Sequence, residues 1–202
     1  ASDNLSLESA TDAIQLASQG SWSARTWAVP PDTVSAGSSS VFVGDDLYVM
    51  RGLSDKAFWK YDLVLNEWIE LEDLPFPAYY GASMTSNGNS LIYVIFGGYS
   101  KKFYQYDTAT GDWTALPDLL DTTWTGASIS FDGTNPYVLR GNASTDFWRY
   151  NVALGEWQSL APISATASTG ASLVYGQNGN FYTPRGANTL TFYRYNVATN
   201  TW

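Results

Sequence analysis

Histidine and cysteine are both missing from the 202-residue chain. Their absence excludes disulfide bonds, thiolate chemistry, zinc fingers, catalytic triads with a histidine, and metal sites built on imidazole. No glycine-rich phosphate loop is present, and no loop has the acid spacing of a known calcium motif. The sequence therefore predicts neither a cofactor nor a metal site.

Positive charge is also scarce. Ten Lys and Arg residues stand against 19 Asp and Glu residues, which gives a formal net charge of -9, and the longest basic run is Lys101-Lys102. Nucleic acids and anionic membrane surfaces are therefore not expected as partners. No apolar stretch approaches the roughly 20 residues of a membrane-spanning helix, so membrane insertion is not expected.

Aromatic residues are abundant instead. They make up 16% of the chain while charged residues make up 14%, which predicts a packed globular interior rather than a disordered chain. The wealth of Ser, Thr, Asn, Tyr and Trp beside few Lys residues favours an extracellular or cell-surface, secreted protein. Two sequons begin at Asn4 and Asn142, and both would be glycosylation acceptors if the source glycosylates.

The aromatic residues recur at fixed spacing. A tyrosine stands four residues before a glycine in four places, a second tyrosine follows that glycine by nine residues, and a tryptophan follows seven residues later. The four sets are Tyr48, Gly52, Tyr61 and Trp68; Tyr93, Gly97, Tyr106 and Trp113; Tyr137, Gly141, Tyr150 and Trp157; and Tyr182, Gly186, Tyr195 and Trp202. Successive sets are 45, 44 and 45 residues apart, so the chain contains a fourfold repeat.

Each repeat predicts four short strands. A strand of small residues comes first, a strand through the first tyrosine follows, and then come an aromatic strand such as Phe58–Tyr61 and a strand at the tryptophan. Turns rich in Gly, Asn and Asp separate them, and length varies only there. Four short strands in a period near 45 residues are typical of β-propeller blades rather than of a sandwich.

Over residues 27 to 202 these motifs resemble the kelch family: a small inner strand, Tyr-x-x-x-Gly, an aromatic strand with Tyr-Asp or Tyr-Asn, then Trp and Leu-Pro. The resemblance implies an all-β, kelch-type β-propeller with four repeats of four-stranded antiparallel blades, in units of about 34–78, 79–123, 124–167 and 168–202. Residues 1–26 form an N-terminal arm outside the repeat.

The sequence departs from the kelch pattern at one position. Kelch blades usually carry a glycine pair, and here the first glycine is replaced by Arg51, Phe96, Arg140 or Arg185. One interpretation is that the arginines stack on neighbouring aromatic rings and serve the blade. The other is that they grip carboxylates or anionic sugars near the propeller mouth.

The two ends of the repeat region are out of phase. The last unit stops at Trp202, where its outer strand begins, while residues 27–31 resemble residues 113–117. We expect the N-terminal strand to complete the last blade, either of its own chain or of a neighbouring one, because an open propeller leaves unpaired sheet edges. Kelch propellers most often have six or seven blades, so part of a longer protein is a third alternative.

In a kelch blade, the loop after the Tyr-x-x-x-Gly strand and the loop before the inner strand emerge on one face. The resemblance therefore implies that one mouth gathers the candidate ligand-binding residues Arg51, Arg140, Arg185, Phe96, Tyr79, Tyr80, Tyr99 and Trp124. Aromatic rings with Arg neighbours suit a glycan or a protein ligand.

These residues favour a non-catalytic extracellular binding module. One alternative is a structural subunit of a filament or assembly that self-associates through the N-terminal segment by strand exchange. A second is a sugar-active enzyme such as a mutarotase or lyase, since kelch relatives include a sialic-acid mutarotase. The copper oxidase of the family needs histidines and a cysteine-linked tyrosine, so that activity is excluded. We expect no catalytic residues.

Overall fold

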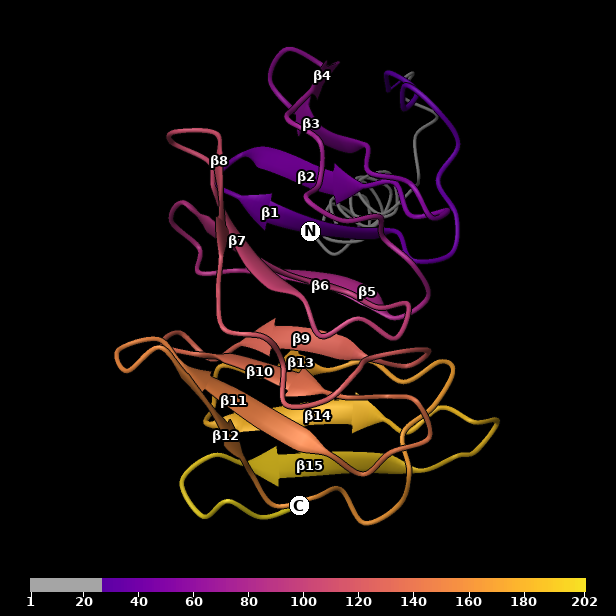
Figure 1. Cartoon of the computed structure of the whole chain (residues 1–202), viewed down its shortest axis with the longest axis vertical. Coiled ribbons are helices and arrows are strands. Elements are labelled where there is room, and N and C mark those ends of the chain that lie inside the picture. Colours follow the sequence, from indigo (N-terminus) through magenta and orange to yellow (C-terminus); the bar gives the residue numbers. More distant parts are fainter. Residues whose placement is uncertain (1–26) are drawn as a thin grey trace, which may run out of the picture.

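Residues 27–202 are described by a computed structural model, and every regular element among them is a β-strand. The N-terminal arm and the Asn4 sequon lie outside the described residues. Fifteen strands form three four-stranded sheets and one three-stranded sheet, each an antiparallel meander in chain order. The expectation of an all-β repeat protein with propeller-like blades is confirmed at this level (Figure 1).

Each sheet is one repeat unit, here called a blade. Blade 1 contains β1 (Ser39–Val43), β2 (Asp46–Met50), β3 (Phe58–Asp62) and β4 (Glu67–Glu70). Blade 2 contains β5 (Ala82–Ser86), β6 (Leu91–Phe96), β7 (Phe103–Asp107) and β8 (Asp112–Ala115). Blade 3 contains β9 (Ser128–Phe131), β10 (Pro136–Leu139), β11 (Phe147–Asn151) and β12 (Glu156–Ser159), and blade 4 contains β13 (Val174–Tyr175), β14 (Asn180–Pro184) and β15 (Phe192–Asn196).

The glycine after each tyrosine strand is required by a close approach of two backbones. Gly97 has a φ of +62°, and a Cβ built on it would lie 2.2 Å from the Tyr80 carbonyl oxygen. An L side chain meets both a steric and a conformational penalty there. Gly52, Gly141 and Gly186 lie equally close to a neighbouring backbone, which explains why this glycine recurs in all four repeats.

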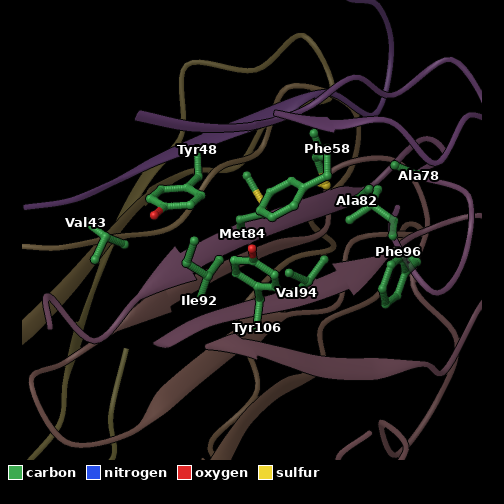
Figure 2. Packing of buried hydrophobic residues seen from close by; sticks show 12 residues of the cluster. Val43, Tyr48, Phe58, Ala78, Ala82, Met84, Ile92, Val94, Phe96 and Tyr106 are labelled. Carbon is green, nitrogen blue, oxygen red and sulfur yellow. The ribbon is translucent and has the colours of Figure 1, made fainter. Parts of the chain in front are cut away.

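The hydrophobic core is divided among the three junctions between consecutive blades. Tyr48 and Phe58 of blade 1 face Val94 and Tyr106 of blade 2 in the first junction, as Figure 2 shows. A phenylalanine of one blade contacts a tyrosine of the next at all three junctions, with ring centroids 4.8 to 5.1 Å apart; the pairs are Phe58–Tyr106, Phe103–Tyr150 and Phe147–Tyr195. The repeated phenylalanines and tyrosines therefore hold consecutive blades together through contacts between their rings.

Hydrogen bonds repeat at the same junctions. The Ser39 hydroxyl accepts a bond from the Met84 amide at 3.1 Å, and Ser83 and Ser128 do the same for the amides of Ile129 and Leu173. The small inner strand thus brings its serines against the backbone of the following blade. β1 packs against β5, β5 against β9, and β9 against β13.

Each repeated tryptophan anchors its blade to the chain segment that enters it. The indole Nε1 groups of Trp68, Trp113, Trp157 and Trp202 donate to the carbonyls of Ala28, Glu72, Pro117 and Ala161, at 2.8, 3.5, 2.9 and 2.8 Å. Ala28 therefore relates to blade 1 as Glu72 relates to blade 2.

This contact corrects one expectation. Residues 27–31 do not complete blade 4 of their own chain. Ala28 donates its amide to Asn66 and accepts from Trp68, and the Trp27 ring meets Tyr61 edge-on at 6.2 Å, so the segment lies against blade 1. Blade 4 has three strands among the described residues, with a single bridge from Asn196 to Thr201 beyond them.

The described blades do not close into a ring. Buried hydrophobic clusters join blade 1 to blade 2, blade 2 to blade 3, and blade 3 to blade 4, and within residues 27–202 none joins blade 4 to blade 1. In Figure 1, β2 and β4 lie toward one end of the long axis and β15 toward the other. Each end blade therefore has one face that no described blade covers.

Candidate functional site

Two of the three repeat arginines are each held by two carboxylates, one in the segment that enters the blade and one in the loop that follows the arginine. Arg51 contacts Asp32 at 2.8 Å and Asp55 at 3.1 Å. Arg140 contacts Asp121 at 2.7 Å and Asp146 at 2.8 Å. The guanidinium Nε of each also donates to a threonine carbonyl. These arginines tie the loop after the second strand to the segment that enters the blade.

The Asp32 carboxyl shows the electrostatic effect of this arrangement. The Thr33 amide donates to it, and together with the nearby Arg51 charge this bond lowers the pKa of Asp32. The Asp32 carboxylate therefore stays ionised, and paired with Arg51, at lower pH than an ordinary aspartate would. The charge of Arg51 is therefore neutralised by Asp32 and Asp55 and does not need a ligand.

Repeat 2 replaces the ion pair by two aromatic rings. Phe96 stands where the arginine does, Phe76 stands where Asp32 and Asp121 do, and the two rings lie 5.7 Å apart. Phe96 is 1% exposed and belongs to the core between blades 1 and 2. The structure therefore places this candidate in the interior and not on a binding surface.

Arg185 differs from both other arginines. Its Nε donates to the Thr166 carbonyl at 2.8 Å, as in the other repeats. The position of Asp32 and Asp121 is taken by Ala165, however, and no carboxylate among residues 27–202 forms an ion pair with Arg185. The guanidinium is oriented in the same way but its charge is not neutralised by a described acid.

Three of the candidate aromatic residues meet in one exposed cluster. Tyr99 stacks on Trp124 with ring centroids 4.5 Å apart and an interplanar angle of 9°, and Tyr80 lies 5.4 Å from the same indole. Tyr80 and Tyr99 are 52% and 59% exposed. We call Tyr80, Tyr99 and Trp124 the aromatic platform.

The loops around the platform are built by backbone contacts. The Tyr99 amide donates to the Thr123 carbonyl, which brings the loop after β6 beside the segment that enters blade 3. Tyr79 lies over Gly98, where a Cβ would come within 2.7 Å of its ring. Tyr79 is 38% exposed and borders the platform. The expectation that these two kinds of loop emerge together agrees with this geometry.

The platform breaks the repeat. Register with the other blades places small or polar residues at eight of the nine equivalent positions: Ser35, Ala36, Ser54, Thr125, Ala143, Ser168, Thr169 and Asn188. The ninth is Tyr79, which corresponds to Trp124. Residues that recur in every blade serve the blade, so a cluster of three rings found at one junction alone needs another explanation. Exposed rings of this kind are typical of binding surfaces.

A hollow lies at the end of the strands opposite the platform. It has a volume of about 460 Å³ and is lined by turns of blades 2, 3 and 4, with Asn87, Asp132 and Gln177 among them. The Asn87 Oδ1 atom accepts three backbone amides of its own turn, and Asp132 Oδ1 accepts two. These polar groups stabilise their turns, so the aromatic platform is the better candidate.

Six of the eight repeated tyrosines are held in the protonated form at neutral pH. Burial raises the pKa of these six above the ordinary value for tyrosine: Tyr48, Tyr93, Tyr106, Tyr137, Tyr150 and Tyr195. Their phenols stay protonated and belong to the junctions between blades. Among the described residues, no group of three or more Asp and Glu residues is arranged to hold a metal ion.

The Asn142 sequon lies in a loop at the end of a strand. Asn142 has a φ of +55° in the loop after β10, and the Ser144 hydroxyl of its sequon donates to Asp146 at 2.8 Å.

Over residues 27–202, no helix has the length and apolarity needed to cross a bilayer. No protein-family model matches the chain, and no curated protein sequence is significantly similar to it.

Proposed function

We propose that the protein is a non-catalytic binding module, a kelch-type propeller that holds a glycan or protein ligand on the aromatic platform of Tyr80, Tyr99 and Trp124. The observation that carries this proposal is that the platform is exposed, preassembled by ring stacking, and confined to one junction of an otherwise regular repeat.

The chemistry of the platform suits a flat ligand surface. Tyrosine and tryptophan offer large apolar faces with a polar edge, and they lose little conformational entropy on binding. The stack with Trp124 holds Tyr99 before the ligand arrives, so less ordering is needed on binding. A sugar ring face and an aromatic or proline side chain of a protein both match this surface. The composition supports an extracellular location, where either ligand is available.

A glycan array and a protein-interaction screen with the full chain would identify the ligand class. Tyr99→Ala and Trp124→Ala should each weaken binding by about 1 to 3 kcal/mol, which is the usual cost of removing a central aromatic contact. Leu154→Ala is the matched control, since Leu154 is 70% exposed on an outer turn of blade 3. Unchanged binding in both aromatic variants would remove the platform from the function.

A further inference from the structure

On the side of blade 4 that faces away from blade 3, residues that are buried in the other blades are exposed to solvent. Phe192 is 64% exposed, whereas the phenylalanines at the same position in the first three blades are 1%, 0% and 1% exposed; they are Phe58, Phe103 and Phe147. Val174 is 59% exposed, and Tyr182 stacks on Phe192 at 6.1 Å. We call Val174, Tyr182 and Phe192 the trailing face.

The outer face of blade 1 is the opposite half of such a junction. Val41 and Val43 of β1 pack toward blade 2, so the alternation of a strand turns Phe42 to the other side, where it is 55% exposed. A hollow of about 310 Å³ lies on this side, with Leu47, Val49 and Trp68 in its lining. We call Phe42, Leu47, Val49, Tyr61 and Trp68 the leading face. Phe42 stands out from it, while Val49 and Tyr61 form its floor and are buried in the single chain.

The three internal junctions show how the two faces would fit. At each junction a phenylalanine contacts both the tyrosine and the tryptophan of the next blade; Phe147, for example, lies 4.8 Å from Tyr195 and 4.9 Å from Trp202. Phe192 is the next phenylalanine in this series. The corresponding tyrosine and tryptophan on the leading face are Tyr61 and Trp68, which contact each other at 4.9 Å.

Glycines at the start of each blade show the same fit between one blade and the next. A Cβ on Gly37, Gly81 or Gly126 would lie 2.3, 2.0 or 2.1 Å from a carbonyl oxygen of the next blade, but a Cβ on Gly170 would meet no atom closer than 3.8 Å. Gly170 has a φ of +86°, which favours glycine by itself, and the space beside it is open where the next blade approaches the other three glycines. Ser172 likewise continues the series of Ser39, Ser83 and Ser128, whose hydroxyls accept amides from the next blade.

We infer that the trailing face of one chain docks on the leading face of a second copy of the same chain, and so makes a fourth junction of the same kind as the three internal ones. Phe192 then enters the hollow beside Trp68 of the second copy, and Ser172 meets the amide of Ser40 there. The interface is head-to-tail, so it continues into a ring or a chain of copies. This inference is independent of the ligand platform.

The second copy is favoured as the occupant because the interface continues one that is already established. The first three junctions differ in individual residues but share the phenylalanine, tyrosine, tryptophan, glycine and serine at fixed positions. Both halves of a fourth junction are present on this chain, on faces that no described hydrophobic cluster joins.

Two single substitutions test the direction of docking. Phe192→Asp places a carboxylate on the trailing face, and Phe42→Asp places one on the leading face. Both side chains are more than half exposed in the single chain, so each variant should keep the circular dichroism spectrum and melting temperature of the parent. Leu154→Asp is the control, because Leu154 is exposed but lies on neither face.

Analytical ultracentrifugation of the full chain should show concentration-dependent assembly of the parent and of Leu154→Asp. Each face variant alone should lose assembly by about a hundredfold or more, because docking would bury an unpaired carboxylate. An equimolar mixture of the two face variants should recover a single heterodimer, since each retains the face that the other lacks. Recovery on mixing distinguishes head-to-tail docking from a symmetric contact.

Three results would overturn the inference. A parent chain that stays monomeric at every concentration would show that these faces are covered in another way, by residues 1–26, by further blades or by a different protein. Assembly that survives both substitutions would place the interface elsewhere. Face variants that are monomeric alone and remain monomeric when mixed would exclude head-to-tail docking. None of these results bears on ligand binding at the platform, which the Tyr99 and Trp124 variants test separately.

Discussion

Replacing Gly126 by alanine should destabilise the protein far more than the same change at Gly170. The two glycines occupy equivalent places in blades 3 and 4, with φ values of +79° and +86°. An alanine pays the same conformational penalty at both, about 1 to 2 kcal/mol for a left-handed residue. The difference between the variants therefore isolates the contact between blades.

That contact is severe at Gly126. The added Cβ would lie 2.1 Å from the Ser168 carbonyl oxygen and 2.4 Å from its carbon, and both are backbone atoms that cannot rotate away. Blade 4 would have to shift against blade 3, at the upper end of the roughly 1 to 3 kcal/mol that overpacking costs. At Gly170 the nearest atom is 3.8 Å away, an ordinary contact.

We expect Gly170→Ala to lower the free energy of unfolding by about 1 to 2 kcal/mol and Gly126→Ala by about 3 to 5 kcal/mol. Urea denaturation, followed by tryptophan fluorescence at a concentration where the chain is monomeric, measures both. Equal losses would refute the reasoning, because they would mean that the glycine is needed for its backbone angle and not for the neighbouring blade. If copies dock as inferred, Gly170→Ala should in addition weaken assembly.

Three further predictions concern the repeat. Ala187→Gly should raise the free energy of unfolding by about 0.5 to 1 kcal/mol, because Ala187 is exposed with a φ of +54° and repeat 2 already has a glycine there; urea denaturation gives the value. Ala165→Asp should give Arg185 the partner that Asp121 gives Arg140, for a gain of up to about 1 kcal/mol that Ala165→Asn does not match and that added salt reduces. The six buried tyrosines should titrate above pH 10 in an ultraviolet absorbance titration. Since their folded pKa values are raised, their stabilising contribution is complete below the unfolded pKa and is lost as the pH rises through the folded values, so an alkaline midpoint near neutrality would contradict their burial.

The architecture was largely predictable because its signals are local. The tyrosine, glycine and tryptophan spacing places one antiparallel meander in each unit, and the observed strands fall within those units. Pairing in a meander joins strands that are adjacent in sequence, so turns and alternation suffice to predict it. The place of residues 27–31 was not predictable in this way, since their likeness to residues 113–117 does not say which blade they enter.

The candidate site was predictable only in part. Proximity of Tyr99 and Trp124 follows from which loops share a face, but the burial of Phe96 depends on Phe76, which no motif connects to it. The ion pairs of Arg51 and Arg140 were missed as well. One signal was available: an aspartate stands 19 residues before each of these arginines, and neither Phe96 nor Arg185 has an acid at the equivalent position.

The tryptophan anchors have a consequence for the evolution of such chains. Each indole bonds to a backbone carbonyl, and each inner serine accepts a backbone amide, so these contacts are indifferent to which side chain the neighbouring unit carries. Gene duplication or loss of one unit of 44 or 45 residues would therefore leave compatible joints on both sides. Side chains at the loop tips take no part in these contacts, so we expect them to vary between copies, as Trp124 and its counterparts Ser35, Tyr79 and Ser168 do.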